Sequence, residues 1–265
     1  MIIKINNLYF SYQSGKEYNQ FKLSVDDWGV NKGAFLSLLG PNGSGKSTLL
    51  KLILRFIKPD RGSIIINGVD IQDYKRKDLA KTIAYVPQKI TSAFPYSVYE
   101  TVMMGRTPYM NFMGFEDEDD RRIVKHALET FEIDHIKHKG INELSGGELQ
   151  RVMIARAVAQ DASIILLDEP NAHLDIEHQV SIYGILNELR RQKRITILTV
   201  THDLNLAGVY SDDIAFMVNG RIVISGKKSE ALNEKNIREI FKVNAEVIKY
   251  TDDILNVLVK PDKLN

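Results

Sequence analysis

One short stretch of the chain, Gly40-Pro41-Asn42-Gly43-Ser44-Gly45-Lys46-Ser47-Thr48, decides its fold. It matches the pattern G-x-x-x-x-G-K-S/T and lies between a predicted strand at residues 34–39 and a predicted helix at residues 46–57. Glycines let the backbone wrap around a phosphate chain, and the start of the helix contributes a positive dipole end. The stretch therefore predicts a nucleotide site in which Lys46 reaches the β- and γ-phosphates and Ser47 holds Mg²⁺. The alternative is a glycine-rich turn before a helix, and the flanking strand and helix disfavour it.

Two carboxylates follow another apolar segment. Residues 164–167 are all aliphatic and predict a buried strand, and Asp168 and Glu169 come directly after it. Ligand sites in open α/β sheets lie at the carboxyl ends of strands. We expect Asp168 to bind Mg²⁺ through water and Glu169 to polarise an attacking water as a general base. Taken alone, such a pair is more typical of a solvated strand end, and only the phosphate loop makes the catalytic interpretation the better one.

A third motif, Leu144-Ser145-Gly146-Gly147-Glu148, precedes a predicted helix at residues 149–160. Ser145 is a good N-cap, and the two glycines expose backbone N–H groups. By itself this is a routine capping turn. In combination with the first two motifs, however, the chain resembles ATP-binding cassette (ABC) proteins, whose signature is LSGGQ. Glu148 stands where that family usually has Gln. The resemblance implies that Ser145 to Glu148 form part of an ATP site, with ATP and Mg²⁺ as the cofactors.

The same resemblance extends over nearly the whole chain and assigns further residues. Tyr12 matches the aromatic residue that stacks on adenine, and Gln88, after Tyr85-Val86-Pro87, matches the glutamine that senses Mg²⁺ and water. Asp175 ends a segment that matches the D-loop, and His202 matches the histidine that contacts the γ-phosphate. Each of these residues has a purely structural alternative, and only the joint pattern outweighs it. Asn171 and Ala172 depart from the usual D-loop, which puts the details of coupling between two cassettes in doubt.

The remaining pattern indicates the fold class. Predicted strands alternate with predicted helices, which favours a mostly parallel sheet with covered faces. No strand is predicted from about Phe94 to Gln160, so this part is interpreted as a helical insertion. The resemblance implies one α/β cassette, since no internal repeat is present. It would have a P-loop NTPase (RecA-like) core at residues 1–92 and 161–265, an antiparallel β sub-domain, and an inserted α-helical sub-domain at residues 93–160.

Composition excludes several classes of protein. The chain has 265 residues with 35 Lys and Arg against 34 Asp and Glu, so it lacks the basic excess of a general nucleic-acid binder. It has no cysteine, which excludes disulfides and thiol chemistry. It shows neither a secretory signal nor an apolar run of about 18 residues, as a membrane helix needs. We expect a protein of the cytoplasm that binds no nucleic acid.

Two motifs point to a branch of the family. Gly105-Arg106-Thr107-Pro108-Tyr109 and the segment at residues 201–207 resemble elements of importer ATPases for ferric siderophores, haem and cobalamin. This implies a homodimer at the cytoplasmic face of the membrane, a separate permease, and indirectly an extracytoplasmic substrate-binding protein. Residues 94–115 are rich in aromatics and methionine, which suits a groove for a permease helix, although about half of them are expected in the core. The alternative is a soluble cassette that serves iron–sulfur cluster assembly.

Overall fold

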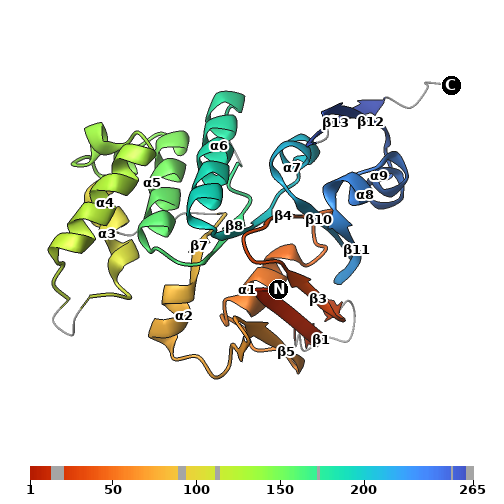
Figure 1. Cartoon of the computed structure of the whole chain (residues 1–265), viewed down its shortest axis with the longest axis horizontal. Coiled ribbons are helices and arrows are strands. Elements are labelled where there is room, and N and C mark those ends of the chain that lie inside the picture. The colour runs from red at the N-terminus through yellow and green to blue at the C-terminus, as the bar shows by residue number, and fades with distance from the viewer. Residues whose placement is uncertain (13–20, 89–93, 111–113, 172–173, 252, 261–265) are drawn as a thin grey trace. The chain divides into compact units, whose positions relative to one another are not determined.

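The computed structural model describes residues 1–12, 21–88, 94–110, 114–171, 174–251 and 253–260, and it divides into two units (Figure 1). Unit 1 comprises Met1–Tyr74 and Thr196–Asn265, and unit 2 comprises Lys75–Ile195. The helical region that we predicted at residues 93–160 falls within unit 2, which extends beyond it on both sides. Among the described residues, no helix combines the length and the apolar character needed to cross a membrane.

Unit 1 begins with an antiparallel sheet built around β1 (Ile3–Ser11). Every second side chain at the start of β1 is buried, which is the pattern of a strand with one face on a core. Its partners are β2 (Lys22–Val25), β3 (Trp28–Val30) and β5 (Arg61–Ile66), and β5 in turn pairs with β6 (Val69–Asp70). A turn at Asn67 and Gly68 joins β5 to β6, with φ angles of 51° and 83°. Positive φ at both central residues is the requirement of a type I′ hairpin turn.

The second sheet region of unit 1 has a parallel, buried centre. Its strands lie in the order β10 (Asp213–Val218), β4 (Phe35–Leu39) and β9 (Thr196–Val200), and β11 (Arg221–Lys227) adds an antiparallel edge beside β10. All residues of β4 and β9 are buried, as expected for parallel strands covered on both faces. The remaining elements of unit 1 are α1 (Lys46–Ile53), α7 (Leu204–Tyr210), α8 (Lys228–Ala231), α9 (Glu234–Phe241), β12 (Asn244–Thr251) and β13 (Ile254–Lys260).

Unit 2 contains one parallel strand pair and a group of packed helices. β7 (Ile83–Val86) pairs with β8 (Ile164–Asp168), and α2 (Arg76–Thr82) and α6 (Ile176–Lys193) flank them in the sequence. The helices α3 (Val98–Met103), α4 (Glu118–Thr130) and α5 (Gly146–Ala159) contact one another pairwise. They are joined by the short 3-10 turns η1 (Met104–Arg106), η2 (Asp134–Ile136) and η3 (Ile141–Glu143). Among the described residues between Phe94 and Gln160 no strand forms, as predicted.

One predicted helix boundary needs correction, and the starts of two other helices also have local causes. The helix expected at residues 46–57 ends at Ile53, because Arg55 adopts a left-handed φ of 56°. Helix α6 begins at Ile176, because the carboxylate of Asp175 accepts a hydrogen bond from the N–H of His178 and caps the helix. Helix α4 begins at Glu118, because Asp117 and Asp120 form a capping box.

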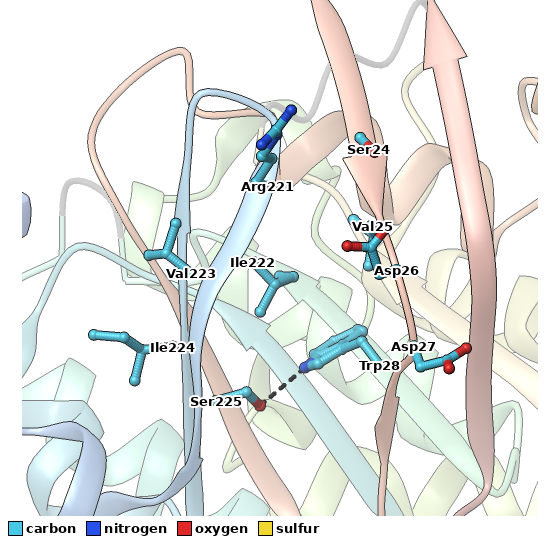
Figure 2. Close-up of a pocket in the computed structure, with 10 residues that line it drawn as sticks. All are labelled: Ser24, Val25, Asp26, Asp27, Trp28, Arg221, Ile222, Val223, Ile224 and Ser225. Atoms are coloured by element: carbon cyan, nitrogen blue, oxygen red, sulfur yellow. Dashed lines mark hydrogen bonds between the residues drawn. The ribbon is translucent and has the colours of Figure 1, made fainter.

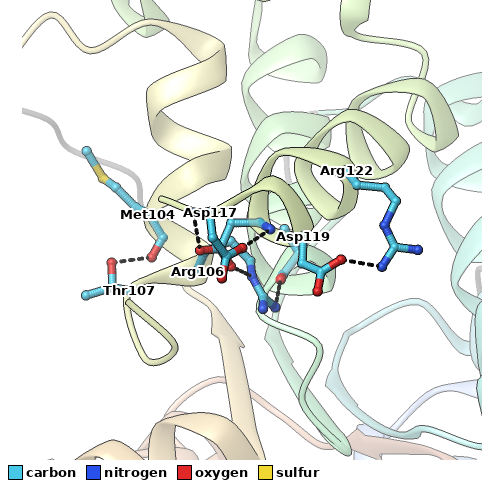
Figure 3. A network of polar contacts seen from close by, with 8 residues as sticks. Met104, Arg106, Thr107, Asp117, Asp119 and Arg122 are labelled. Carbon is cyan, nitrogen blue, oxygen red and sulfur yellow. Dashed lines mark hydrogen bonds and ion pairs between the residues drawn. The ribbon is translucent and has the colours of Figure 1, made fainter. Parts of the chain in front are cut away.

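A buried ion pair and a hydrogen bond from the same arginine link η1 to α4 and α5 (Figure 3). The Nε of Arg106 donates to Oδ1 of Asp120 at 2.7 Å, and the side chains are only 6% and 4% exposed. A second guanidinium nitrogen of Arg106 donates to the carbonyl oxygen of Ala159 at 2.9 Å. The preceding residue must be glycine, because a Cβ on Gly105 would lie 2.3 Å from the carbonyl oxygen of Arg156. The Gly-Arg motif at residues 105–106 thus joins η1 to both α4 and α5.

Candidate functional site

The phosphate loop follows β4 in unit 1 and has a backbone that only glycine can adopt at two points. Gly40 has a φ of 148°, and a Cβ there would lie 2.0 Å from the carbonyl oxygen of Met217. Gly45 has a φ of 106°, and a Cβ there would lie 2.6 Å from the ring of Phe21. The loop is thus packed between Met217 of β10 and Phe21, which directly precedes β2, and both glycines lack the side chain that would clash there.

Lys46, Ser47 and Thr48 form the first turn of α1, directly after the loop. The ammonium group of Lys46 is buried and donates to the carbonyl oxygens of Gly40 at 2.8 Å and Pro41 at 3.0 Å. The hydroxyl of Ser44 is buried and has no hydrogen-bond partner within the part of the chain that the structure describes. A buried polar group without a partner is costly. This hydroxyl in the phosphate loop therefore fits a ligand oxygen.

An aromatic cluster lies beside the loop. Tyr12 is 41% exposed, and its ring contacts Phe10 edge to face at 4.8 Å and Phe21 at 6.3 Å between centroids. Phe21 also lies against Gly45, so the cluster connects Tyr12 to the phosphate loop. Phe21 is absent from the predicted site residues. Its place depends on the pairing of β1 with β2, and residues 13–20 between them lie outside the described residues.

His202 follows β9, the strand parallel to β4, and so emerges at the same sheet edge as Gly40. The residues on both sides of it are held in place. The N–H of Thr201 donates to the carbonyl oxygen of Leu38 at 3.3 Å, and the hydroxyl of Thr201 accepts from the N–H of Asp203 at 3.1 Å. Unit 1 thus brings the phosphate loop and His202 to the carboxyl ends of neighbouring strands.

In unit 2 the structure brings Gln88 and Glu169 together. The side-chain nitrogen of Gln88 donates to a carboxylate oxygen of Glu169 at 2.5 Å. Both residues follow parallel strands, Gln88 after β7 and Glu169 after β8, so the contact lies at the carboxyl edge. Glu169 has a left-handed φ of 51°, which is unfavourable for a residue with a side chain. Such strain persists where the surrounding structure holds it, and it is frequent at functional sites.

Asp168 ends β8 and is buried. Burial, the negative charge of Asp168 and a hydrogen bond to its carboxylate together raise the pKa of the neighbouring Tyr85 to about 12. The phenol therefore stays protonated and can serve as a donor to this carboxylate. The sequence pattern gave Tyr85 no role beyond its place in the segment before Gln88. Its contact with Asp168 is evident only from the tertiary structure.

Ser145 caps α5 as the sequence predicted, and the helix begins at Gly146. Its hydroxyl accepts from the N–H of Glu148 at 3.3 Å and donates to the carboxylate of Glu148 at 2.8 Å. The N–H of Ser145 donates to the same carboxylate oxygen, also at 2.8 Å. These hydrogen bonds lower the pKa of Glu148. The glutamate that replaces the usual glutamine thus completes a capping box around the signature serine.

Asp175 and the signature turn are linked by a residue that sequence reasoning missed. The carboxylate of Asp175 lies 2.6 Å from Nδ1 of His178, and its hydrogen bonds to the N–H and ring of His178 lower its pKa. The ring of His178 also lies against Gly147, where a Cβ would come within 3.2 Å of it. The starts of α5 and α6 are therefore neighbours. Ala172 and His173 of the D-loop lie outside the described residues.

The aromatic and methionine-rich segment is partly core and partly surface. Met103 is buried, and the ring of Tyr109 lies against Arg106 at 3.9 Å and Lys81 at 4.9 Å. Phe112 and Met113 lie outside the described residues. The side chains exposed on the surface are Phe94 at 63%, Tyr96 at 38%, Met104 at 36% and Phe115 at 66%.

A pocket of ≈ 380 Å³ in unit 1 lies apart from the predicted residues (Figure 2). It is lined by strands β2, β3 and β11 and the turn between β2 and β3, and the indole of Trp28 donates to the hydroxyl of Ser225 across it at 3.0 Å. None of its lining residues was predicted to bind nucleotide. In the described part of the chain, no cluster of three or more His, Asp or Glu side chains is arranged to hold a metal ion.

Comparison with known proteins identifies the family. A sequence profile of the ABC transporter family matches residues 23–172, more than half of the chain. The iron(3+)-hydroxamate import ATP-binding protein FhuC of Bacillus subtilis is 36% identical over 229 residues, which cover 86% of this chain and 85% of that protein. The achromobactin transport ATP-binding protein CbrD of Dickeya dadantii is 38% identical over 217 residues, which cover 82% and 81%.

Solved structures of ABC transporter proteins are also similar to this chain. A transporter described as metal-chelate type, in an inward-facing conformation, matches with a TM-score of 0.84 and 28% identity, covering 100% of this chain and 99% of that chain. A dimeric ATP-binding cassette in a post-hydrolysis state with ADP and Pi matches with a TM-score of 0.73 and 30% identity, covering 85% and 98%.

Proposed function

The chain belongs to the ABC transporter family of ATP-hydrolysing cassettes, and from this premise we propose that it powers uptake of a metal chelate through a separate membrane permease. A ferric siderophore is the first choice of substrate, and haem or cobalamin is the next. The siderophore assignment is supported by relatives named for hydroxamate and achromobactin transport. The mechanism is supported chiefly by one observation, the hydrogen bond between Gln88 and Glu169 at the carboxyl edge of β7 and β8.

The residues of this chain divide the work of hydrolysis. Lys46 and the backbone of the phosphate loop bind the β- and γ-phosphates, and Tyr12 stacks on the adenine. Glu169 accepts a proton from the attacking water, and its hydrogen bond to Gln88 keeps the carboxylate oriented. His202 contacts the γ-phosphate from the end of β9. When bound, the metal ion neutralises charge on the phosphate oxygens.

Mg²⁺ fits the donors that the chain offers. Mg²⁺ binds in proteins through one or two side-chain oxygens and keeps its other positions for water and substrate phosphates. A dedicated cluster of carboxylates is therefore not needed, which agrees with its absence among the described residues. Ser47 would hold the ion directly, and Asp168 would bind it through water. Gln88 would sense both the ion and the water. The hydroxyl of Ser44, which lacks a partner in the described structure, is a further donor for a phosphate oxygen.

The signature turn serves a second copy of the chain. One chain has one phosphate loop and one signature, and we infer that Ser145, Gly146 and Gly147 of one copy face the γ-phosphate held by the other. Glu148 orients the hydroxyl of Ser145, and Asp175 supports the neighbouring turn through His178. A relative cassette has been solved as a dimer. The working assembly proposed here is a homodimer with two ATP molecules at its interface.

The exposed side chains Phe94, Tyr96, Met104 and Phe115 form the surface that docks the permease. In the sequence, two of them precede α3 and two follow it, and Phe94 comes six residues after Gln88. Single exposed apolar side chains are common on protein surfaces, whereas a group of them on one surface is typical of a contact site. The partner is a cytoplasmic helix of the permease, which places the chain at the cytoplasmic face of the membrane. An extracytoplasmic protein would deliver the substrate on the other side.

Replacement of Glu169 by Gln tests this function. Removal of a general base typically lowers turnover by about 10²–10⁴-fold, whereas the neutral amide still fits the site and leaves ATP binding intact. ATPase turnover and nucleotide affinity are measured on the purified complex, and uptake of a ⁵⁵Fe-labelled hydroxamate siderophore is measured in cells. Turnover near that of the wild type would show that Glu169 is not the base. Normal iron uptake in cells that lack the protein would exclude the siderophore substrate.

A further inference from the structure

The C-terminal hairpin formed by β12 and β13 lies outside the residues that match the family profile. No predicted site residue lies on it. One face of the hairpin, with Ala245, Leu255 and Val257, is buried in a core cluster that also contains Ala207 of α7 and Leu39 at the end of β4. Leu39 directly precedes the phosphate loop, and α7 directly follows the loop that carries His202. The hairpin therefore shares a core with both parts of the nucleotide site in unit 1.

Asn205 connects α7 to the edge of this hairpin. Its side-chain oxygen accepts from the N–H of Val257 at 2.6 Å, and its side-chain nitrogen donates to the carbonyl oxygen of Val257 at 3.4 Å. A side-chain amide carries the same donor and acceptor as a peptide group. Asn205 thus takes the place that a neighbouring strand would occupy at this residue of β13, and both backbone groups of Val257 are satisfied by one side chain.

Two further contacts hold α7 against the hairpin. A Cβ on Gly208 would lie 2.2 Å from the carbonyl oxygen of Leu255, so the backbones of helix and strand are in direct contact there. The ammonium group of Lys228 donates to the carbonyl oxygens of Val209 at 3.4 Å and of Asp253 in the hairpin. A helix of 7 residues, such as α7, has little stability of its own, so contacts of this kind determine where it lies.

The position of α7 in turn sets the loop of His202. The carboxylate of Asp203 accepts from the N–H groups of Asn205 and Leu206, both at 2.9 Å, and so attaches the loop to the first turn of the helix. On the other side, Thr201 is fully buried and bound to the end of β4. One end of the loop is therefore attached to the sheet, and the position of its other end depends on α7.

We propose that Asn205 is a positioning residue for His202, and that the C-terminal hairpin is the support through which it acts. Pairing with Val257 holds the first turn of α7, Asp203 carries that constraint to the loop, and His202 is kept where it meets the γ-phosphate. This inference rests on the role proposed for His202. It gives the hairpin, which lies outside the matched family region, a part in ATP turnover.

The test is a double-mutant cycle in the full-length chain with Asn205→Ala, His202→Ala and both together. Loss of positioning lowers kcat by about tenfold or more while the KM for ATP stays within about twofold, since misplacement of a reacting group by 1 Å can cost 10²-fold. If Asn205 acts through His202, the double variant has the same kcat as His202→Ala alone. Asn205→Asp keeps the acceptor for the N–H of Val257, and its kcat should lie between those of the wild type and Asn205→Ala.

Lys260→Ala is the matched control, because it removes the exposed ion pair with Glu246 at 2.8 Å on the same hairpin and leaves Asn205 untouched. Its kcat should equal that of the wild type. A wild-type kcat for Asn205→Ala would overturn the inference. So would additive effects, in which Asn205→Ala lowers kcat by the same factor in the His202→Ala background as in the wild type. A wild-type kcat for His202→Ala would instead refute the proposed role of His202. Thermal melting of each variant checks that it is folded, and Gly208→Ala, which forces α7 from β13, supplies an independent perturbation with the same expected result.

Discussion

Removal of the guanidinium of Arg106 should destabilise the helical part of unit 2 far more than removal of any exposed arginine. Arg106→Met keeps most of the apolar volume of the side chain but leaves the buried carboxylate of Asp120 without its cation. Within the described residues, that carboxylate then keeps a hydrogen bond from the N–H of Asp117 at 3.3 Å and no cation. The carbonyl oxygen of Ala159 also loses its donor.

The magnitude follows from the burial of the pair. Breaking a buried ion pair by removing one partner costs about 3–5 kcal/mol, because an uncompensated charge stays in the interior. For a chain of this length the same loss lowers the melting temperature by about 5–10 °C. Arg122→Met is the matched control, on α4, the helix that carries Asp120. It breaks an ion pair with Asp119 at 2.8 Å whose side chains are both 76% exposed, and such pairs contribute about 1 kcal/mol or less.

The assay is urea unfolding followed by far-UV circular dichroism and by tryptophan fluorescence. The single tryptophan, Trp28, lies in unit 1, so fluorescence reports on that unit while circular dichroism is dominated by helices. A loss confined to unit 2 shifts the circular dichroism midpoint more than the fluorescence midpoint. The double variant Arg106→Met with Asp120→Leu, which buries no unpaired charge, should regain part of the loss. If Arg106→Met unfolds at the same urea concentration as Arg122→Met, the buried pair does not hold the helices together.

Four further predictions concern the site. Gly40→Ala should abolish nucleotide binding measured by calorimetry, because a Cβ would meet a backbone oxygen at 2.0 Å, and normal affinity would contradict the loop geometry. Mixing a Lys46→Ala chain with a Ser145→Ala chain should restore ATPase activity through one intact site per dimer, and no recovery in demonstrated heterodimers would exclude the trans arrangement. A cysteine at Phe115 should cross-link to the permease in membranes with a yield that depends on ATP, whereas cross-links within the chain alone would place the docking surface elsewhere. The pKa of Glu148 in the folded protein is lowered from the usual glutamate value of 4.5. Its ionised carboxylate therefore contributes to stability above pH 4.5, and this contribution is lost as the pH falls through the lowered pKa. An NMR titration of the carboxyl carbon of Glu148 measures that pKa.

Several features of the protein could be predicted from sequence because they depend on neighbours along the chain. The phosphate loop needs glycine at the positions where φ is positive, and Gly40 and Gly45 are such positions. The cap of α5 joins Ser145 to Glu148, and the turn between β5 and β6 uses Asn67 and Gly68. The buried strands β4 and β8 follow from unbroken apolar runs. In each case the hydrogen bonds or dihedral angles span only a few residues, so a local pattern is sufficient to predict them.

Other features depend on which segments the fold places side by side. Gln88 and Glu169 meet because β7 pairs with β8, and Phe21 reaches Gly45 through contacts that no local pattern encodes. Arg106 could be recognised as part of a motif, but its partner Asp120 and its contact with α5 could not.

The sequence by itself determined the family, the phosphate loop and the residue types of the catalytic site, because these rest on spacing within short segments. Only the tertiary structure decided the partners of those residues, including the link from Asn205 to Val257, because strand order and helix packing bring distant backbone groups within hydrogen-bond distance.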